Sequence, residues 1–87
     1  TGAGTLAIII TSRGKETAAA IRECAGRGVT SMKATGEYTG LMRDVLLCAC
    51  SKSEAYLVKN AVRKTDEQAF LMFTETSEVF GEGFKQE

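Results

Sequence analysis

The stretch that decides the fold is Gly26-Arg27-Gly28-Val29-Thr30, which a short polar run separates from Gly36-Glu37-Tyr38-Thr39-Gly40. Glycine adopts backbone angles that other residues avoid, so the first two glycines suit the end of a helix and a sharp entry into a strand. The second two bracket a turn. The stretch therefore predicts a junction between two units, each made of a strand and a helix, within one compact domain.

Hydrophobic periodicity on both sides of this junction predicts six elements. The sequence Ser51-Lys52-Ser53-Glu54 has the pattern of a capping box, which starts a helix. We expect strands at 6–10, 29–35, 42–50 and 69–74, helices at 15–25 and from the capping box to about residue 64, and a glycine-rich tail at 77–84.

The resulting order is βαββαβ, which predicts an α+β fold of the ferredoxin-like kind, with a four-stranded antiparallel sheet and two helices on one face. The first and third strands are expected at the centre, because both of their faces are apolar. Two helices cover only one face of such a sheet. The other face would leave apolar surface in water, so we expect something else to cover it, most simply another copy of the domain.

Composition sets limits on function. The 87 residues suffice for a single domain, 1–87, and the formal net charge is zero, which disfavours a nucleic-acid partner. The chain has no histidine and no CxxC motif, so we expect no metal site and no cofactor. No apolar run has the length of a membrane span. The chain begins without methionine, and we expect it to be a piece of a longer protein.

The three cysteines indicate buried thiols in a reducing compartment. Cys48 and Cys50 are two residues apart in an apolar strand, on the same side of it, which disfavours a mutual disulfide. Cys24 falls beside the apolar face of the first helix. We therefore expect all three to act mainly as small hydrophobic residues.

Three functions associated with this fold do not fit the residues. The central strands have no aromatic side chains on which RNA bases would stack. The first loop, Thr11-Ser12-Arg13-Gly14, lacks the cysteine pair of a metal chaperone, and the only asparagine, Asn60, falls in mid-helix, away from any loop where it could orient water for acyl-phosphate hydrolysis. We therefore expect no catalytic residues and no enzymatic activity.

Several spaced motifs closely resemble the C-terminal soluble domain of YitT-type bacterial membrane proteins. These motifs are the two glycine stretches quoted above, Val45-Leu46-Leu47-Cys48, Ala69-Phe70 and Glu78-Val79-Phe80-Gly81-Glu82-Gly83-Phe84. The resemblance covers nearly the whole chain. It implies that the parent chain has a bundle of membrane helices and that this domain follows the bundle, at the cytoplasmic face of the cell membrane. It also implies a domain of no established activity.

The glycine junction is also similar, more distantly, to the nitrogen-regulatory PII proteins. That resemblance implies a trimer with inward-facing sheets and nucleotides bound between subunits. The turn at 37–39 is much shorter than the regulatory loop of PII proteins, which puts PII-like docking on a partner protein in doubt.

A small anionic ligand or nucleotide, if one binds, is expected near the glycine junction, the following turn and the tail. The candidate residues are Arg27, Gly28, Tyr38, Gly81, Gly83 and Phe84. Glycines permit close backbone approach, while an arginine and a tyrosine supply charge and stacking. Each has a structural alternative: Arg27 can pair with Glu23, Tyr38 can be a plain turn residue, and Phe84 can anchor the tail. Because the helix end and the turn lie at opposite ends of one strand, we expect a neighbouring subunit to complete the site.

Two further groups of residues have a structural and a functional interpretation. The segment Thr11-Ser12-Arg13-Gly14-Lys15 opens a helix beside two cations and is a candidate for phosphate, although it lacks P-loop spacing. Lys52, Tyr56, Lys59 and Arg63 form a helical stripe that is either a solvated face or a contact with acidic lipid.

Taken together, the residues and the resemblance predict a regulatory, ligand-binding and oligomerising domain of a bacterial membrane protein, with a trimer favoured. The alternatives are a purely structural trimerisation domain without ligand, and an uncharacterised small enzyme.

Overall fold

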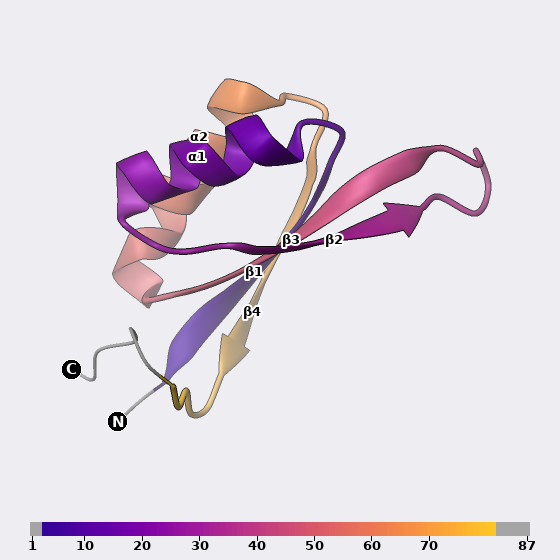
Figure 1. Cartoon of the computed structure of the whole chain (residues 1–87). Coiled ribbons are helices and arrows are strands. Elements are labelled where there is room, and N and C mark those ends of the chain that lie inside the picture. The colour runs from indigo at the N-terminus through magenta and orange to yellow at the C-terminus, as the bar shows by residue number, and fades with distance from the viewer. Residues whose placement is uncertain (1–2, 82–87) are drawn as a thin grey trace.

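The computed structural model describes residues 3–81 of the chain (Figure 1). Its elements follow the predicted order βαββαβ. The strands are β1 (Gly4–Thr11), β2 (Thr30–Thr35), β3 (Met42–Cys50) and β4 (Phe70–Thr76), and the helices are α1 (Gly14–Ala25) and α2 (Ala55–Thr65), the latter preceded by a 3-10 turn, η1 (Lys52–Glu54).

The four strands form one antiparallel sheet in the order β2-β3-β1-β4. Both helices lie on the same side of this sheet (Figure 1). The predicted α+β class, the ferredoxin-like arrangement and the central position of the first and third strands are therefore confirmed. The two edge strands, β2 and β4, each have one neighbour.

The hydrophobic core lies between the sheet and the two helices. In β1 the odd-numbered residues are buried beneath the helices and the even-numbered residues are half-buried on the other face. Side chains with no exposed surface come from every layer of the core: Ala7, Ile9, Ile21, Leu46, Cys48, Cys50, Val58, Ala61 and Val62. Since these residues recur at period two in the strands and at helical spacing in α2, the pattern in the sequence specifies the core.

Local signals set the ends of the helices. Ser51 and Glu54 form the predicted capping box, because the hydroxyl of Ser51 accepts from the N–H of Glu54 and the carboxylate of Glu54 accepts from the N–H of Ser51. Gly26 ends α1 in the left-handed conformation, with φ of 68°, and its N–H donates to the carbonyl of Arg22. The strand predicted at 6–10 is longer than expected, because pairing with β3 and β4 extends it to Gly4–Thr11.

Within residues 3–81, neither helix combines the length and the apolar character that crossing a membrane requires.

Candidate functional site

The face of the sheet opposite the helices is an apolar surface, which we call the open face. The strand register places side chains from all four strands on it. Its apolar members are Leu6, Ile8, Ile10, Met32, Ala34, Val45, Leu47, Ala49, Phe70 and Met72. This arrangement confirms the predicted two-sided apolar character of the central strands.

Solvent reaches much of the open face. Met32 is 50% exposed, Phe70 56% and Met72 44%. Among the described strand residues on this face only Arg43 is charged, and its guanidinium bends back to the carbonyl of Met42 at 2.9 Å. A continuous apolar surface of this kind is typical of an interaction site.

Arg27 lies in the connection between α1 and β2, and its side chain is only 18% exposed. Its Nε donates to the carbonyl of Ala49 at 3.0 Å and lies 3.9 Å from Oε1 of Glu54. The pairing of β2 with β3 stops at Thr30 and Leu47, so the guanidinium meets a carbonyl that β2 does not reach. These contacts with β3 and η1, and not the pair with Glu23 that helical spacing suggested, hold Arg27 in place.

The predicted ligand residues do not form one cluster within the chain, because Tyr38 lies far from Arg27. Tyr38 is fully exposed in the turn between β2 and β3, at the far end of the sheet (Figure 1). Since β3 has nine residues, about 3.3 Å apart, the two ends of the strand are separated by roughly 25 Å. Gly28 adjoins Arg27, and Gly81 follows β4, whose last residues pair with the first residues of β1 at the Arg27 end. Gly83 and Phe84 lie outside the described residues.

The loop between β1 and α1, considered above for phosphate, is held by a carboxylate of the protein itself. The Oδ2 atom of Asp44 accepts from the N–H of Gly14 at 3.0 Å, and its Oδ1 accepts from Nζ of Lys33 at 2.7 Å. The hydrogen bond from the Lys33 ammonium is the main reason that the pKa of Asp44 lies below its ordinary value of 3.8; burial opposes it, and the hydrogen bond from Gly14 and the charge of Lys33 lower the pKa further. An aspartate already occupies the first turn of α1, which disfavours a phosphate there.

A second aspartate holds the other side of the same loop. Asp66 accepts a hydrogen bond of 2.5 Å from the hydroxyl of Thr11, and its other oxygen accepts from the N–H of Gln68 at 3.0 Å. The bond from Thr11 is the main reason that the pKa of Asp66 lies below its ordinary value. The hydroxyl of Thr11 also accepts from the N–H of Arg13 at 3.0 Å. Two carboxylates, one in β3 and one directly after α2, therefore fix the β1–α1 loop.

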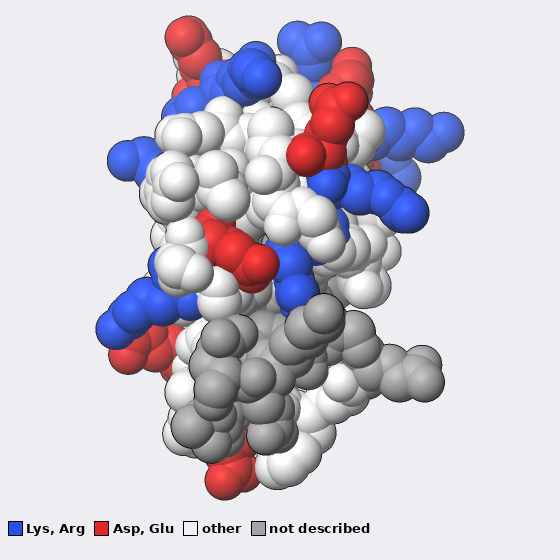
Figure 2. Space-filling view, turned by 90° about the vertical axis from the view of Figure 1, so that its left-hand side faces the viewer, with Lys and Arg blue, Asp and Glu red and all other residues white. Residues whose placement is uncertain are grey.

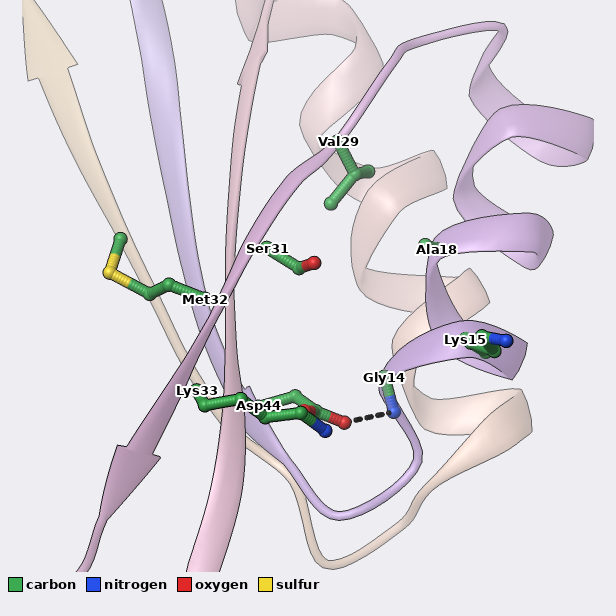
Figure 3. A pocket seen from close by; sticks show the side chains of 8 residues that line it. All are labelled: Gly14, Lys15, Ala18, Val29, Ser31, Met32, Lys33 and Asp44. Carbon is green, nitrogen blue, oxygen red and sulfur yellow. Dashed lines mark hydrogen bonds and ion pairs between the residues drawn. The ribbon is translucent and has the colours of Figure 1, made fainter.

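A groove of about 450 Å³ runs between the start of α1 and the edge strand β2 (Figure 3). Val29, just before β2, and Ser31 in β2 point toward the helix, whereas Met32 points to the opposite side of the sheet. The ion pair of Lys33 with Asp44 closes one end. The groove exists because α1 packs over β3 and does not cover the edge strand.

Two of the four residues of the predicted basic stripe, Lys52 in η1 and Arg63 in α2, make contacts within the chain. Lys52 pairs with Glu75 at 3.2 Å, and Nη1 of Arg63 donates to the carbonyls of Glu67 and Ala69, each at 2.9 Å. Figure 2 shows that basic and acidic side chains alternate on the side of the molecule that it presents. The contacts of Lys52 and Arg63 favour the interpretation of the stripe as a solvated face.

The cysteines differ in their surroundings. Cys48 and Cys50 have no exposed surface, and burial raises the pKa of both thiols, that of Cys48 to about 11. Cys24 is exposed beside a groove between α1 and α2, so its predicted burial is wrong. It lies in the last turn of α1, where its side chain is not covered by the second helix.

Asp44 and Asp66 were not among the predicted site residues. Asp44 is the one acidic residue of β3, directly before the apolar run 45–50, and that is the signal that identifies it in the sequence. Asp66 follows α2 immediately, where turn residues are common, and its sequence position gives no indication of its contact with Thr11.

The fold and the open face together define a small α+β domain with an apolar interaction surface. The chain belongs to the DUF2179 family, described as uncharacterized proteins conserved in bacteria, because residues 27–81 match the model of that family.

Relatives of known sequence are membrane proteins or are uncharacterised. The chain is 38% identical over 81 residues to the UPF0750 membrane protein YvjA of Bacillus subtilis, covering 93% of this chain and 29% of YvjA. It is 39% identical over 85 residues to an uncharacterised protein in the cccA 5' region of Bacillus sp. strain PS3, covering 98% of this chain and 57% of that protein. With YitT of B. subtilis it shares 28% identity over 75 residues, 86% of this chain and 27% of YitT. The resemblance to YitT-type membrane proteins is confirmed, and the chain spans less than a third of the length of YvjA or YitT.

Solved structures agree with this assignment. A DUF2179 protein from Eubacterium ventriosum superposes with a TM-score of 0.66 at 25% identity, over 82% of this chain and 97% of that one. A functionally unknown protein from Pediococcus pentosaceus gives a TM-score of 0.74 at 7% identity, over 92% of this chain and 97% of that one, and so shares the fold.

Proposed function

We propose that the domain is a non-enzymatic, self-associating regulatory unit at the cytoplasmic face of a bacterial membrane protein, assembled through the open face of its sheet. The observation that carries this proposal is that face: an apolar surface that spans four strands while the helices cover only the other side. Apolar area of this extent favours burial against a partner. Membership of a family that includes UPF0750 membrane proteins supports the tethered setting.

A second copy is the simplest partner for the open face. The surface has no charged side chain at its centre, so two copies can meet there without burying unpaired charge. Identical patches on identical chains are the usual basis of closed symmetric oligomers. The trimer implied by the distant PII resemblance is the first assembly to test.

Ligand binding between subunits is the second part of the proposal. Arg27 with Gly28 lies at one end of the sheet and the fully exposed Tyr38 at the other, so one chain does not bring both to one small ligand. In an assembly, the turn that bears Tyr38 in one copy can approach the Arg27 end of its neighbour. A small anion or nucleotide bound there would stabilise the assembly.

Sedimentation velocity of the 87-residue chain tests self-association. Ile8 lies at the centre of the open face, and we expect the Ile8→Asp variant to sediment as a monomer under conditions where the wild type is an oligomer. Tyr56→Asp is the matched control, because it places the same charge on an exposed side chain of α2 and should leave the oligomer intact. A wild type that is monomeric at micromolar concentration would refute the proposal.

Thermal shift with a panel of nucleotides and small anionic metabolites tests the ligand. A ligand of the folded assembly raises the melting temperature of the wild type and does so less for Arg27→Ala, Tyr38→Ala and Ile8→Asp. If no compound shifts the melting temperature while the oligomer persists, the structural trimerisation domain without ligand is the better description.

A further inference from the structure

The outer edge of β4 is a second self-association surface of the chain: we infer that it pairs, antiparallel, with β4 of another copy. β4 pairs with β1 on one side, and no strand of residues 3–81 lies on its other side. This contact uses backbone groups at the rim of the sheet. It is therefore distinct from the open-face contact and does not depend on it.

Two hydrogen bonds fix the direction of the backbone groups along the sheet. The N–H of Gly4 donates to the hydroxyl of Thr76 at 3.1 Å, so Gly4 faces β4. The carbonyl of Ala49, which is paired with Leu6, accepts from Arg27 and so faces away from β1. The direction of the backbone N–H and C=O groups alternates from residue to residue along an antiparallel strand. Both observations therefore give the same result: the N–H and C=O groups of the even-numbered residues of β1 point toward β4.

The same alternation leaves free groups on the outer side of β4. The residues of β4 that pair with Leu6, Ile8 and Ile10 are even-numbered, so the N–H and C=O groups of the even-numbered residues of β4 point toward β1. The N–H and C=O groups of Leu71 and Phe73 therefore point outward from the sheet. An exposed row of this kind is a template for another strand.

The side chains around this edge are apolar on both faces. Phe70 and Met72 lie on the open face, while Leu71 and Phe73 lie on the helix side, where Phe73 is still 38% exposed. The register between β1 and β4 runs without a bulge from Gly4 to Ile10. β4 therefore lacks the lysine, proline and bulge that keep free edges from pairing.

The opposite edge strand has such a protective group. β2 carries Lys33, which is 76% exposed at its side chain and paired with Asp44, among polar neighbours. β4 also carries a charge, Glu75, which is 73% exposed and paired with Lys52, but it lies near the end of the strand, outside the apolar run 70–73. Lys33 lies in the middle of β2, and this difference favours β4 over β2 as the edge that a partner covers.

A second copy of β4 fits this edge. With Met72 opposite Met72 of the other copy, Leu71 faces Phe73 and each of these outward-facing pairs can exchange both backbone hydrogen bonds. In this register Glu75 lies opposite Ala69, so the two Glu75 carboxylates do not meet. The carbonyl of Ala69 already accepts from Arg63 at 2.9 Å, so the proposed pairing is centred on residues 71–73.

Cysteine cross-linking tests the pairing. In a Cys24→Ser background, Met72→Cys places two thiols in a non-hydrogen-bonded pair, where side chains are closest, and mild oxidation should give a disulfide-linked dimer. Met32→Cys, at the opposite edge and similarly exposed, is the matched control. Because Met72 and Met32 both lie on the open face, the two variants are compared in a Leu47→Asp background, where the open-face contact is disrupted, and there Met32→Cys should stay monomeric on the gel. No dimer from Met72→Cys, or as much from Met32→Cys, overturns the inference.

Two additional variants separate the edge contact from the open-face contact. Leu47→Asp disrupts the open face two strands away and should leave the Met72→Cys dimer in place. Phe73→Pro removes an outward N–H without breaking a bond to β1 and should abolish the dimer. If circular dichroism shows that the proline variant is unfolded, Phe73→Lys, which adds a charge beside the edge, should abolish it instead. A dimer lost in Leu47→Asp, or retained in the folded Phe73 variant, contradicts edge pairing.

Discussion

The carboxylate of Asp44 in β3 accepts a hydrogen bond of 3.0 Å from the backbone N–H of Gly14, thirty positions earlier in the chain. This bond attaches the first turn of α1 to a central strand. A β-carbon added at Gly14 would lie only 2.8 Å from Cβ of Asp44, so the two positions constrain each other.

The close approach predicts the effect of Gly14→Ala. Alanine is the better helix former, yet we expect a loss of roughly 1–3 kcal/mol in the free energy of unfolding, because the added methyl group overlaps Asp44. Urea denaturation measures the change. Gly28→Ala is the control, since nothing lies within 4 Å of a β-carbon added there. Equal stability of Gly14→Ala and wild type would show that the overlap is relieved at no cost.

The two aspartates of the β1–α1 loop predict acid sensitivity. The pKa values of Asp44 and Asp66 are both lowered from 3.8 in the fold. A carboxyl with a lowered folded pKa stabilises the fold above its unfolded pKa, and this contribution disappears as the pH falls through the folded value. We therefore expect the melting temperature to fall steeply below about pH 4.

Replacing both aspartates by asparagine should flatten this acid dependence. Thermal melts between pH 2 and pH 7 measure it. Replacing Glu37, in the exposed turn between β2 and β3, by glutamine should leave the profile unchanged. If the double asparagine variant follows the wild-type profile, other carboxylates control acid unfolding.

The three thiols should react at very different rates. Cys24 is exposed, whereas Cys48 and Cys50 are fully buried and their thiol pKa values are raised. A reagent therefore cannot reach Cys48 and Cys50, and neither thiol forms the reactive thiolate at neutral pH. With a chromogenic disulfide reagent we expect one fast thiol in the native protein and three in denaturant. The fast phase should vanish in Cys24→Ser. Rapid native reaction of a second thiol would mean that the core opens readily.

Arg27 should contribute to stability even without a ligand. Its side chain satisfies the carbonyl of Ala49 beyond the end of β2 and lies beside Glu54. Arg27→Met leaves that carbonyl without the bond, and we expect a loss on the order of 1–3 kcal/mol in urea denaturation. Lys59→Met, on the exposed side of α2, is the control and should change little. An unaffected Arg27→Met variant would leave ligand binding as the main role of this side chain.

Much of the fold is specified by local sequence. The strand predicted at 42–50 is the observed β3, and the capping box at Ser51 starts the second helix as expected. Both signals act over a few residues: apolar alternation in one case, two reciprocal hydrogen bonds in the other.

The contacts of the candidate site depend on tertiary register and were therefore harder to predict. Helical spacing favoured Glu23 as the partner of Arg27, whereas the fold brings Ala49 and Glu54 to it. Similarly, the exposure of Cys24 depends on how much of α1 the second helix packs against, which is a tertiary contact. The open face was predictable because two helices can cover only one face of a four-stranded sheet, while the central strands are apolar on both faces.

The place of β4 in the sheet also governs the order of folding. β1 is a central strand, yet one of its two neighbours is the last strand of the chain, and the bond from Gly4 to Thr76 spans 72 positions. The sheet therefore closes only after residues 70–76 have left the ribosome. Until then β1 has one free flank, and long-range pairing of this kind slows folding. A nascent chain that ends before Phe70 holds a three-stranded sheet whose central strand has become an edge, and such a chain is open to mispairing.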